Sequence, residues 1–201
     1  MTLRYYQKDG IDNVSNLYKH GTRRIAYQLA TGGGKTVTFA GMTDRYLKAF
    51  PNKQVLICVH RDELLKQTRR TLFNGYKINF EPIVSKTKHI TTNTKGYVAM
   101  VETIYNRLKK NPYLTKKIGM LIVDECHIGN FKKIYDFFPD ALIVGFTATP
   151  KTASKKDPLK NYFDEIVVGP QIDELINIGS LCQNETYSIK GINRKSLGIK
   201  R

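Results

Sequence analysis

The chain has few cysteines, because Cys58, Cys126 and Cys182 are the only ones among 201 residues. Their number is odd, they lie far apart in the sequence, and no Cys-x-x-Cys pair occurs. This pattern argues against a disulfide framework and indicates neither a zinc site nor a catalytic cysteine, so it fits a reducing compartment better than a secretory one. Cys58 and Cys126 are most simply interpreted as small apolar residues near strand ends.

Long apolar runs and leader-like segments are also missing. The sequence contains no run of about 18 apolar residues, which argues against a membrane span. Residues 1–9 are too polar for a signal peptide. We therefore expect a cytoplasmic or nucleoid-associated protein that is not secreted and has no membrane partner.

Acidic residues are scarce beside basic ones, with 17 Asp and Glu against 33 Lys and Arg and a net charge of +16. Such a balance favours a polyanionic partner, and nucleic acid is the usual one. Residues 85–117 hold eight basic residues and one acid, and residues 151–160 hold four lysines and one acid. A lysine-rich surface can also be merely solvated. In the functional interpretation, these lysines line a groove that follows the nucleic-acid backbone irrespective of base sequence.

The apolar content, 41% of the residues, is enough for one substantial core. Strand-like and helix-like segments alternate, which predicts an α/β fold with a mostly parallel sheet covered by helices on both faces. The predicted strands are 24–29, 54–59, 80–84, 96–100, 118–123 and 141–146. The predicted helices are 7–19, 35–49, 62–73, 101–109, 131–137 and 172–177, and 85–96 is a predicted loop.

A glycine run precedes a lysine and a threonine in residues 28–36, which read Gln-Leu-Ala-Thr-Gly-Gly-Gly-Lys-Thr. Three glycines let the backbone fold tightly around an oxyanion, with its N–H groups and the start of the next helix directed at phosphate. Lys35 is then expected to reach the terminal phosphates and Thr36 to bind magnesium. The general pattern has glycine where this chain has Leu29, and a glycine-rich turn without a ligand is the alternative.

Two carboxylates follow the apolar run 118–123, in the sequence Asp124-Glu125-Cys126-His127. Acids at the carboxyl end of a central parallel strand lie in the crevice where such sheets bind ligands. We expect Asp124 to hold magnesium and Glu125 to orient or deprotonate the attacking water. The structural alternative is a strand that stops at a charged turn.

A third apolar run, 141–146, ends in Thr147-Ala148-Thr149-Pro150. Two threonines beside the carboxylate strand are candidates for a bridge between the nucleotide site and whatever the protein moves. Threonines that end a strand and a proline that stops it are equally compatible with a purely structural role.

These three segments resemble, in order and spacing, those of superfamily 2 helicases and translocases. Residues 3–7 resemble that family's adenine-reading element, and residues 59–67 resemble a segment that lies along nucleic acid. Residues 98–104 resemble the next strand and helix start, and residues 163–167 with 174–179 are similar to the far edge of the same domain. The resemblance covers nearly the whole chain and is closest to restriction-enzyme motor subunits and DNA repair or recombination helicases.

The resemblance implies a RecA-like P-loop domain that uses ATP and Mg²⁺. The implied ATP-binding residues are Arg4, Gln7, Ala30, Thr31, Gly32, Gly33, Gly34, Lys35 and Thr36. The implied catalytic residues are Lys35, Asp124, Glu125 and His127, with Thr36 and Asp124 as metal ligands. The implied nucleic-acid contacts are His60, Arg61, Glu102 and Thr103, and Thr147 and Thr149 are the implied coupling residues.

The family also implies a second RecA-like domain, which supplies arginines that stabilise the transferred phosphoryl group. No second-domain motif occurs in the sequence. We expect residues 1–183 to form the first motor domain and 184–201 to begin a linker toward a second domain, present in cis or in trans. The expected function is an ATP-dependent helicase or translocase, with DNA favoured over RNA. The alternatives are a single-domain nucleic-acid-binding module and the motor part of a restriction or repair nuclease.

Overall fold

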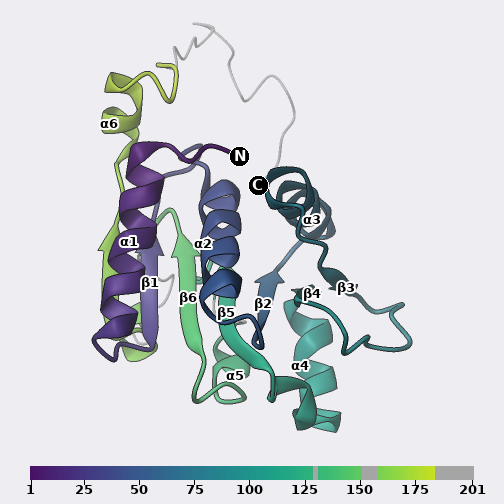
Figure 1. Ribbon diagram of the computed structural model, residues 1–201. Coiled ribbons are helices and arrows are strands. Elements are labelled where there is room, and N and C mark those ends of the chain that lie inside the picture. The colour runs from purple at the N-terminus through teal and green to yellow at the C-terminus, as the bar shows by residue number, and fades with distance from the viewer. Residues whose placement is uncertain (129–130, 151–157, 184–201) are drawn as a thin grey trace, which may run out of the picture.

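The computed structural model describes residues 1–128, 131–150 and 158–183, whose strands form one seven-stranded sheet (Figure 1). The strand order is β3-β4-β2-β5-β6-β1-β7, and every pair of neighbours is parallel. The strands are β1 (Arg24–Gln28), β2 (Gln54–Val59), β3 (Glu81–Ile83), β4 (Gly96–Met100), β5 (Ile118–Asp124), β6 (Leu142–Thr147) and β7 (Glu165–Val168). The predicted α/β class is confirmed.

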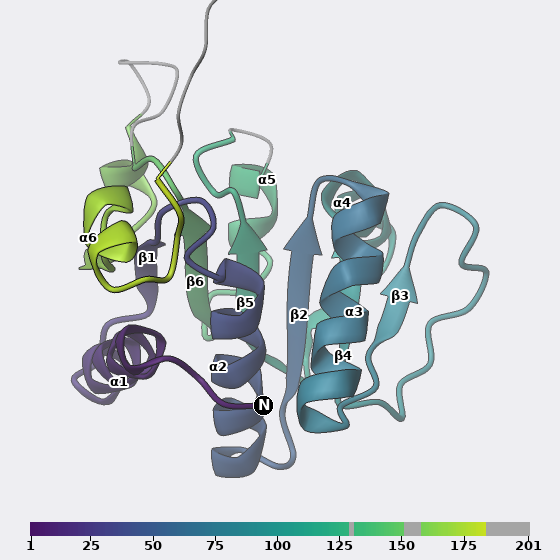
Figure 2. The same ribbon diagram turned by 90° about the horizontal axis from the view of Figure 1, so that it is seen from above.

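Helices cover both faces of the sheet (Figures 1 and 2). They are α1 (Tyr5–Lys19), α2 (Lys35–Ala49), α3 (Asp62–Tyr76), α4 (Val101–Lys110), α5 (Lys132–Tyr135) and α6 (Ile172–Asn177), with 3-10 turns at Pro112–Thr115 and Leu159–Asn161. Apolar residues of α1, α2 and α3 share one core cluster with one face of the sheet, and those of α4 and α5 share a second cluster with the other face. All residues of β2, β5 and β6 are buried, as expected for strands covered on both sides.

The predicted bounds of β2, β4, α2 and α6 agree with the structure. The first strand ends at Gln28, one residue earlier than predicted, whereas β5 continues to Asp124 and β6 to Thr147. Helix α1 begins at Tyr5 instead of residue 7, because the Gln7 side chain accepts a hydrogen bond from the Arg4 backbone and caps the first turn. Helix α3 runs past residue 73 to Tyr76.

The edge strand β7 was not predicted. It pairs in parallel with β1, from Ile25 opposite Glu165 to Gln28 opposite Val168. Only Val167 of its four residues is buried. A short, half-exposed strand lacks the continuous apolar run that marks the central strands, so its sequence carries little signal.

The parallel arrangement gathers every strand end at one edge of the sheet and every strand start at the other. The loops after β1, β2, β5 and β6 therefore meet at the carboxyl edge, and these loops carry the segments singled out in the sequence. Within the described residues, no helix has the length and apolar content needed to cross a bilayer. Cys58 and Cys126 are buried as predicted, and Cys182 is exposed.

Candidate functional site

The glycine-rich loop joins the end of β1 to the start of α2, and its conformation requires glycine at two positions. Gly32 (φ 82°) and Gly34 (φ 84°) lie in the left-handed region, which side chains with a Cβ seldom adopt. Between them, a Cβ on Gly33 would stand 3.0 Å from the carbonyl oxygen of Ala30. Leu29, the departure from the general pattern, is fully buried in the core. The loop is therefore a tight backbone turn, in which Thr31 and Gly32 are exposed.

Lys35 is the first residue of α2, and only 13% of its side chain is exposed. Its ammonium lies 3.2 Å from Glu125 Oε1. The first turn of α2 contains no acidic residue, so the helix itself supplies no carboxylate to compensate the positive end of its dipole. Thr36 follows at the second helical position and is partly exposed. A helix start without an acidic residue of its own and with a largely buried lysine favours an anionic ligand.

Asp124 ends β5 and is only 6% exposed. Burial raises the pKa of its carboxyl group, and the neighbouring Glu125 raises it further. Its Oδ1 atom is buried and accepts no hydrogen bond from the described residues. A desolvated carboxylate oxygen without a partner is costly, and a bound cation would satisfy it.

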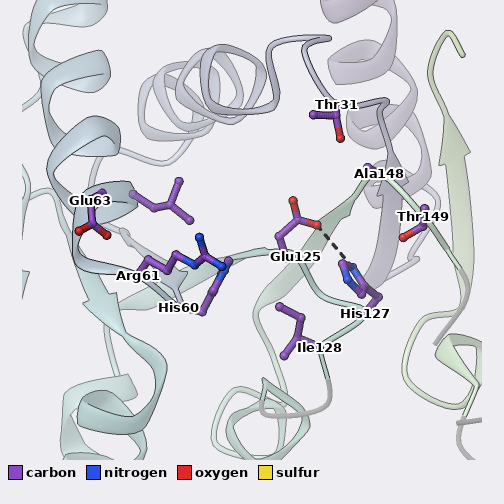
Figure 3. Close-up of a pocket in the computed structure, with 10 residues that line it drawn as sticks. Thr31, His60, Arg61, Glu63, Glu125, His127, Ile128, Ala148 and Thr149 are labelled. Carbon is purple, nitrogen blue, oxygen red and sulfur yellow. Dashed lines mark ion pairs between the residues drawn. The ribbon is translucent and has the colours of Figure 1, made fainter. Parts of the chain in front are cut away.

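Glu125 adopts φ 54°, one of two positive φ values among the described non-glycine residues. Such a conformation costs of order 1–3 kcal/mol and tends to occur at functional sites. Its carboxylate contacts Lys35 through Oε1 and His127 through Oε2, which lies 3.4 Å from His127 Nδ1. Figure 3 shows the contact between Glu125 and His127. The strained backbone thus accompanies a carboxylate that contacts both the Lys35 ammonium and the His127 imidazole.

His127 links the carboxylate box to the threonine segment after β6. Its Nδ1 lies 2.9 Å from Thr147 Oγ1, and that hydroxyl donates to the Thr149 carbonyl oxygen at 2.8 Å. A hydroxyl has one proton to donate, so His127 Nδ1 must carry the proton in this arrangement. The predicted coupling residues Thr147 and Thr149 therefore connect to Glu125 through one imidazole.

Arg4 and Gln7 lie against the phosphate loop. The buried Gln7 donates from Nε2 to the Gly33 carbonyl oxygen at 3.1 Å. Tyr6, which was not predicted as a site residue, donates its hydroxyl to the same carbonyl at 3.1 Å and accepts from the Arg4 guanidinium. An aromatic residue between Arg4 and Gln7 is typical of a hydrophobic core, so the sequence did not indicate a role for Tyr6 in the site.

Leu181 is a second residue that sequence reasoning missed. A Cβ added to Gly32 would lie 2.6 Å from Leu181 Cδ2, so the segment after α6 packs on the phosphate loop. The Leu181 backbone N–H donates a hydrogen bond to the carbonyl oxygen of Leu175 at 3.0 Å. Leu175 is fully buried, so this bond holds Leu181 in place. The far end of the described chain thus limits the space above the loop.

A pocket of about 640 Å³ opens beside these groups at the carboxyl edge (Figure 3). Predicted site residues that line it are Thr31, His60, Arg61, Glu125, His127 and Thr149. His60 Nδ1 is buried and has no hydrogen-bond partner among the described residues. The pocket therefore joins the carboxylate box to two residues predicted to contact nucleic acid.

Two other predicted nucleic-acid contacts do not line this pocket. Glu102 and Thr103 lie in the first turn of α4, and Glu102 is ion-paired with Lys133 at 2.6 Å. Two lysines of the predicted basic groove, Lys95 and Lys117, lie away from the pocket, because they directly precede β4 and β5 at the amino edge of the sheet. Lys151, Lys155 and Lys156, and the predicted linker 184–201, lie outside the described residues.

The comparisons with known proteins agree on one group. The family model described as "Type III restriction enzyme, res subunit" matches residues 1–152. The chain is 34% identical to the Saccharomyces cerevisiae protein named "Putative ATP-dependent helicase IRC3", over 94% of this chain and 29% of that protein. It is 26% identical to the EcoAI type I restriction endonuclease subunit of Escherichia coli, over 82% of this chain and 21% of that subunit.

Solved structures share the fold at low identity. The type ISP restriction-modification enzyme LlaGI, solved with a DNA substrate mimic, gives a TM-score of 0.69 at 20% identity over 90% of this chain and 21% of that one. The UvsW helicase of bacteriophage T4 gives 0.67 at 18% identity over 84% of this chain and 60% of that one. The chain spans between 15% and 34% of the length of the curated relatives it matches.

Proposed function

The chain belongs to the type III restriction enzyme res-subunit family, a group of superfamily 2 helicase-type ATP-binding domains, and from this premise we propose that it is the first motor domain of an ATP-hydrolysing translocase or helicase. The observation that carries the proposal is the Lys35–Glu125 pair at 3.2 Å, together with the buried Oδ1 of Asp124, which has no hydrogen-bond partner among the described residues. A phosphate-binding cation, a metal-binding carboxylate and a candidate base thus meet at one edge of the sheet. A domain of residues 1–183, continuing toward a second RecA-like domain, is part of this proposal.

The residues at the carboxyl edge fit ATP with magnesium. The backbone of residues 31–36 would surround the phosphates, Lys35 would neutralise the terminal ones, and Arg4 and Gln7 would lie toward the base. Thr36 and Asp124 offer the oxygen ligands that magnesium prefers. Bound Mg²⁺ would neutralise part of the phosphate charge and thereby assist phosphoryl transfer.

The proposed cycle uses the ion pair as a switch. When Lys35 turns to a bound phosphate, Glu125 loses its strongest cationic partner and becomes free to accept a proton from water. His127, which contacts both Glu125 and Thr147, would report that change to Thr149 at the wall of the pocket. The strained backbone at Glu125 is consistent with a side chain that alternates between two arrangements, one paired with Lys35 and one released from it.

Nucleic acid is the proposed track, with DNA favoured over RNA. The net charge of +16 supports a polyanionic partner. The His60 and Arg61 side chains line the same pocket as Glu125, which would couple backbone contacts to the state of the nucleotide. Relatives described as restriction endonuclease subunits and a neighbour solved with a DNA substrate mimic support DNA, and a restriction motor is the favoured setting.

The direct test is ATP affinity of the Lys35→Ala variant. We expect the dissociation constant for ATP and Mg²⁺ to rise by about tenfold or more, because a charge-assisted contact to phosphate is lost. Lys48→Ala is the matched control, since Lys48 lies in the last turn of the same helix with 75% of its side chain exposed. An unchanged affinity in Lys35→Ala, measured by titration calorimetry, would contradict the phosphate-loop assignment.

Turnover is the second test. The chain's hydrolysis of ATP should be measured with and without duplex DNA, with Lys35→Ala as the blank. Stimulation by DNA that vanishes in the variant would show a self-sufficient motor. Binding of both ligands without turnover would show that a second domain completes the catalytic cleft.

A further inference from the structure

A second pocket, of about 630 Å³, lies at the opposite edge of the sheet from the candidate nucleotide site. It opens below the starts of β4, β2 and β5, which are adjacent in the strand order. Strand β2 is six residues long, so this pocket lies about 20 Å from the carboxyl edge. No group bound at the phosphate loop can reach it, so it requires its own explanation.

Three lysines line this amino-edge pocket, one directly before each of the three strands. Lys53 precedes β2, Lys95 precedes β4 and Lys117 precedes β5. The sheet fixes two of them through their backbones, because the Lys117 carbonyl accepts from Gln54 N at 2.8 Å and the Lys95 carbonyl accepts from Val55 N at 3.1 Å. The three positions are far apart in the sequence, and only the parallel topology brings them together.

One wall of the pocket is held in place by Gln54, which is only 6% exposed. Its Nε2 donates to the carbonyl oxygens of Thr92 at 2.9 Å and Thr94 at 2.8 Å. The loop before β4 is therefore tied to the first residue of β2. The pocket is formed before any ligand arrives, so binding pays little ordering entropy.

The charge of the pocket is unbalanced. Glu81 is the one carboxylate among the described residues that line it, against three lysines. Within the described parts of the chain, none of Lys53, Lys95 and Lys117 forms an ion pair; the Lys95 ammonium donates to the Pro51 carbonyl oxygen at 3.1 Å. Exposed ammonium groups without carboxylate partners retain their attraction for an anion.

The remaining lining residues determine which anion fits. Asn52, Asn79 and Asn93 supply amide donors, and no aromatic side chain is among the described lining residues. Without an aromatic side chain, the described lining offers no ring on which a nucleobase could stack. Its chemistry suits phosphate oxygens, which accept from ammonium and amide groups alike.

We propose that the pocket formed by Lys53, Lys95 and Lys117 is a second phosphate-binding site, which holds the backbone of a nucleic-acid segment at the amino edge of the sheet. It gives the domain two contacts with the polymer on opposite edges, one that senses the nucleotide and one that does not. This proposal rests on nucleic acid being the partner, and it adds a site that the proposed motor cycle does not require.

The first experiment compares two triple variants of the full chain in duplex DNA binding. Lys53, Lys95 and Lys117 are changed to Gln in one, and Lys8, Lys19 and Lys48, which are exposed and do not line the pocket, are changed to Gln in the other. Fluorescence anisotropy is recorded between about 50 and 200 mM salt. Because each lost phosphate contact lowers the slope of log K against log salt by about 0.9, the pocket variant should lose between about 2 and 3 units of slope. The control should keep the wild-type slope.

The second experiment reads each lysine separately in the unmodified chain, so it does not depend on any variant folding. Acetylation of lysines by a reactive ester is followed by mass spectrometry, with no ligand, with duplex DNA, or with inorganic tripolyphosphate. Protection of Lys53, Lys95 and Lys117 by DNA, several-fold above that of Lys8 and Lys19, supports the site.

The outcomes separate the two proposals. If DNA binds but neither the slope nor the protection distinguishes the pocket lysines from the controls, the second site is wrong and the proposed function stands. If DNA does not bind the wild-type chain, the nucleic-acid part of the proposed function fails with it. Protection by tripolyphosphate but not by DNA would overturn the nucleic-acid occupant and identify a soluble polyphosphate as the ligand.

Discussion

At the carboxyl edge of the sheet, polar groups are held in costly arrangements, whereas at the amino edge comparable groups are satisfied. Glu125 has a left-handed backbone, and the Asp124 Oδ1 atom is buried without a partner among the described residues. At the other edge, the buried side chain of Gln54 donates two hydrogen bonds and its backbone N–H donates a third. The difference indicates that one edge stores strain for chemistry and that the other only presents a stable surface.

The two edges also differ in how their charges are paired. Lys35 at the carboxyl edge is largely buried and lies beside a carboxylate, an arrangement that a ligand must disrupt. The lysines at the amino edge are exposed and have no carboxylate partner among the described residues. An anion at the carboxyl edge therefore changes the state of the protein, and an anion at the amino edge adds affinity alone.

The largest expected difference between the edges is in catalysis. Glu125→Gln should lower ATP hydrolysis by the complete motor by roughly 10² to 10⁴-fold, because the amide cannot accept a proton from water. ATP affinity should be retained, since the phosphate contacts of Lys35 remain. The matched control is Asp140→Asn, an exposed acid in the turn before β6 at the amino edge, which should leave the rate unchanged. Steady-state turnover with saturating ATP checks both, and full activity in Glu125→Gln would remove this residue from the role of base.

A smaller contrast is expected between two glycines with positive φ, Gly34 at the phosphate loop and Gly21 in the turn before β1. Both substitutions to Ala incur about 1–2 kcal/mol of left-handed strain. A Cβ on Gly34 would also lie 2.5 Å from Gln7 Nε2 and displace its bond to Gly33, whereas a Cβ on Gly21 meets nothing within 4 Å. Breaking that bond adds about 1 kcal/mol.

Gly34→Ala should thus lose about 2–3 kcal/mol of stability, and its ATP affinity should fall by at least about tenfold. Gly21→Ala should lose only about 1–2 kcal/mol, which comes from left-handed strain, with its ATP affinity unchanged. Urea unfolding and ATP titration of both variants measure these two quantities. Equal losses in the two variants would show that the carboxyl edge is no more constrained than an open turn.

Sequence reasoning located the carboxyl edge because its chemistry demands residue types at fixed spacing. A lysine at a helix start and two acids at a strand end are visible as a pattern wherever the fold is parallel. The central strands were equally accessible, since β2 and β4 are continuous apolar runs with clear ends. Tyr6 was not predicted as a site residue, because its role comes from one hydrogen bond to the phosphate loop and not from its residue type.

The amino edge could not be found in the same way. Lys95 and Lys117 belong to a basic stretch that the sequence made conspicuous, but Lys53 does not. Their common pocket depends on strand order, in which β2 lies between β4 and β5. Strand order is set by packing across the whole sheet, so a list of charges along the chain cannot reveal it.

The smallest expected contrast is in the free energy of unfolding. Replacing a buried polar side chain should raise it at the carboxyl edge and lower it at the amino edge. Asp124→Asn replaces a buried carboxylate, whose Oδ1 has no hydrogen-bond partner among the described residues, with a neutral group of the same shape. It should therefore stabilise the free protein by about 1 kcal/mol, or about 2–4 °C in Tm. Gln54→Ala removes a satisfied side chain with two hydrogen bonds and should destabilise it by about 1–2 kcal/mol.

Thermal unfolding without ATP or magnesium measures both variants, and the sign of the Asp124 change decides the comparison. A stabilised Asp124→Asn protein would mean that the Asp124 carboxylate lowers the stability of the free protein. Binding of a metal ion would then explain why this position holds a carboxylate. A destabilised one would mean that the carboxylate is already paired in solution, with Lys35 as the nearest candidate, since its charge lowers the pKa of Asp124 against the effect of burial. In that case the carboxyl edge would be as relaxed as the amino edge, and the strain at Glu125 would have to be explained by Glu125 alone.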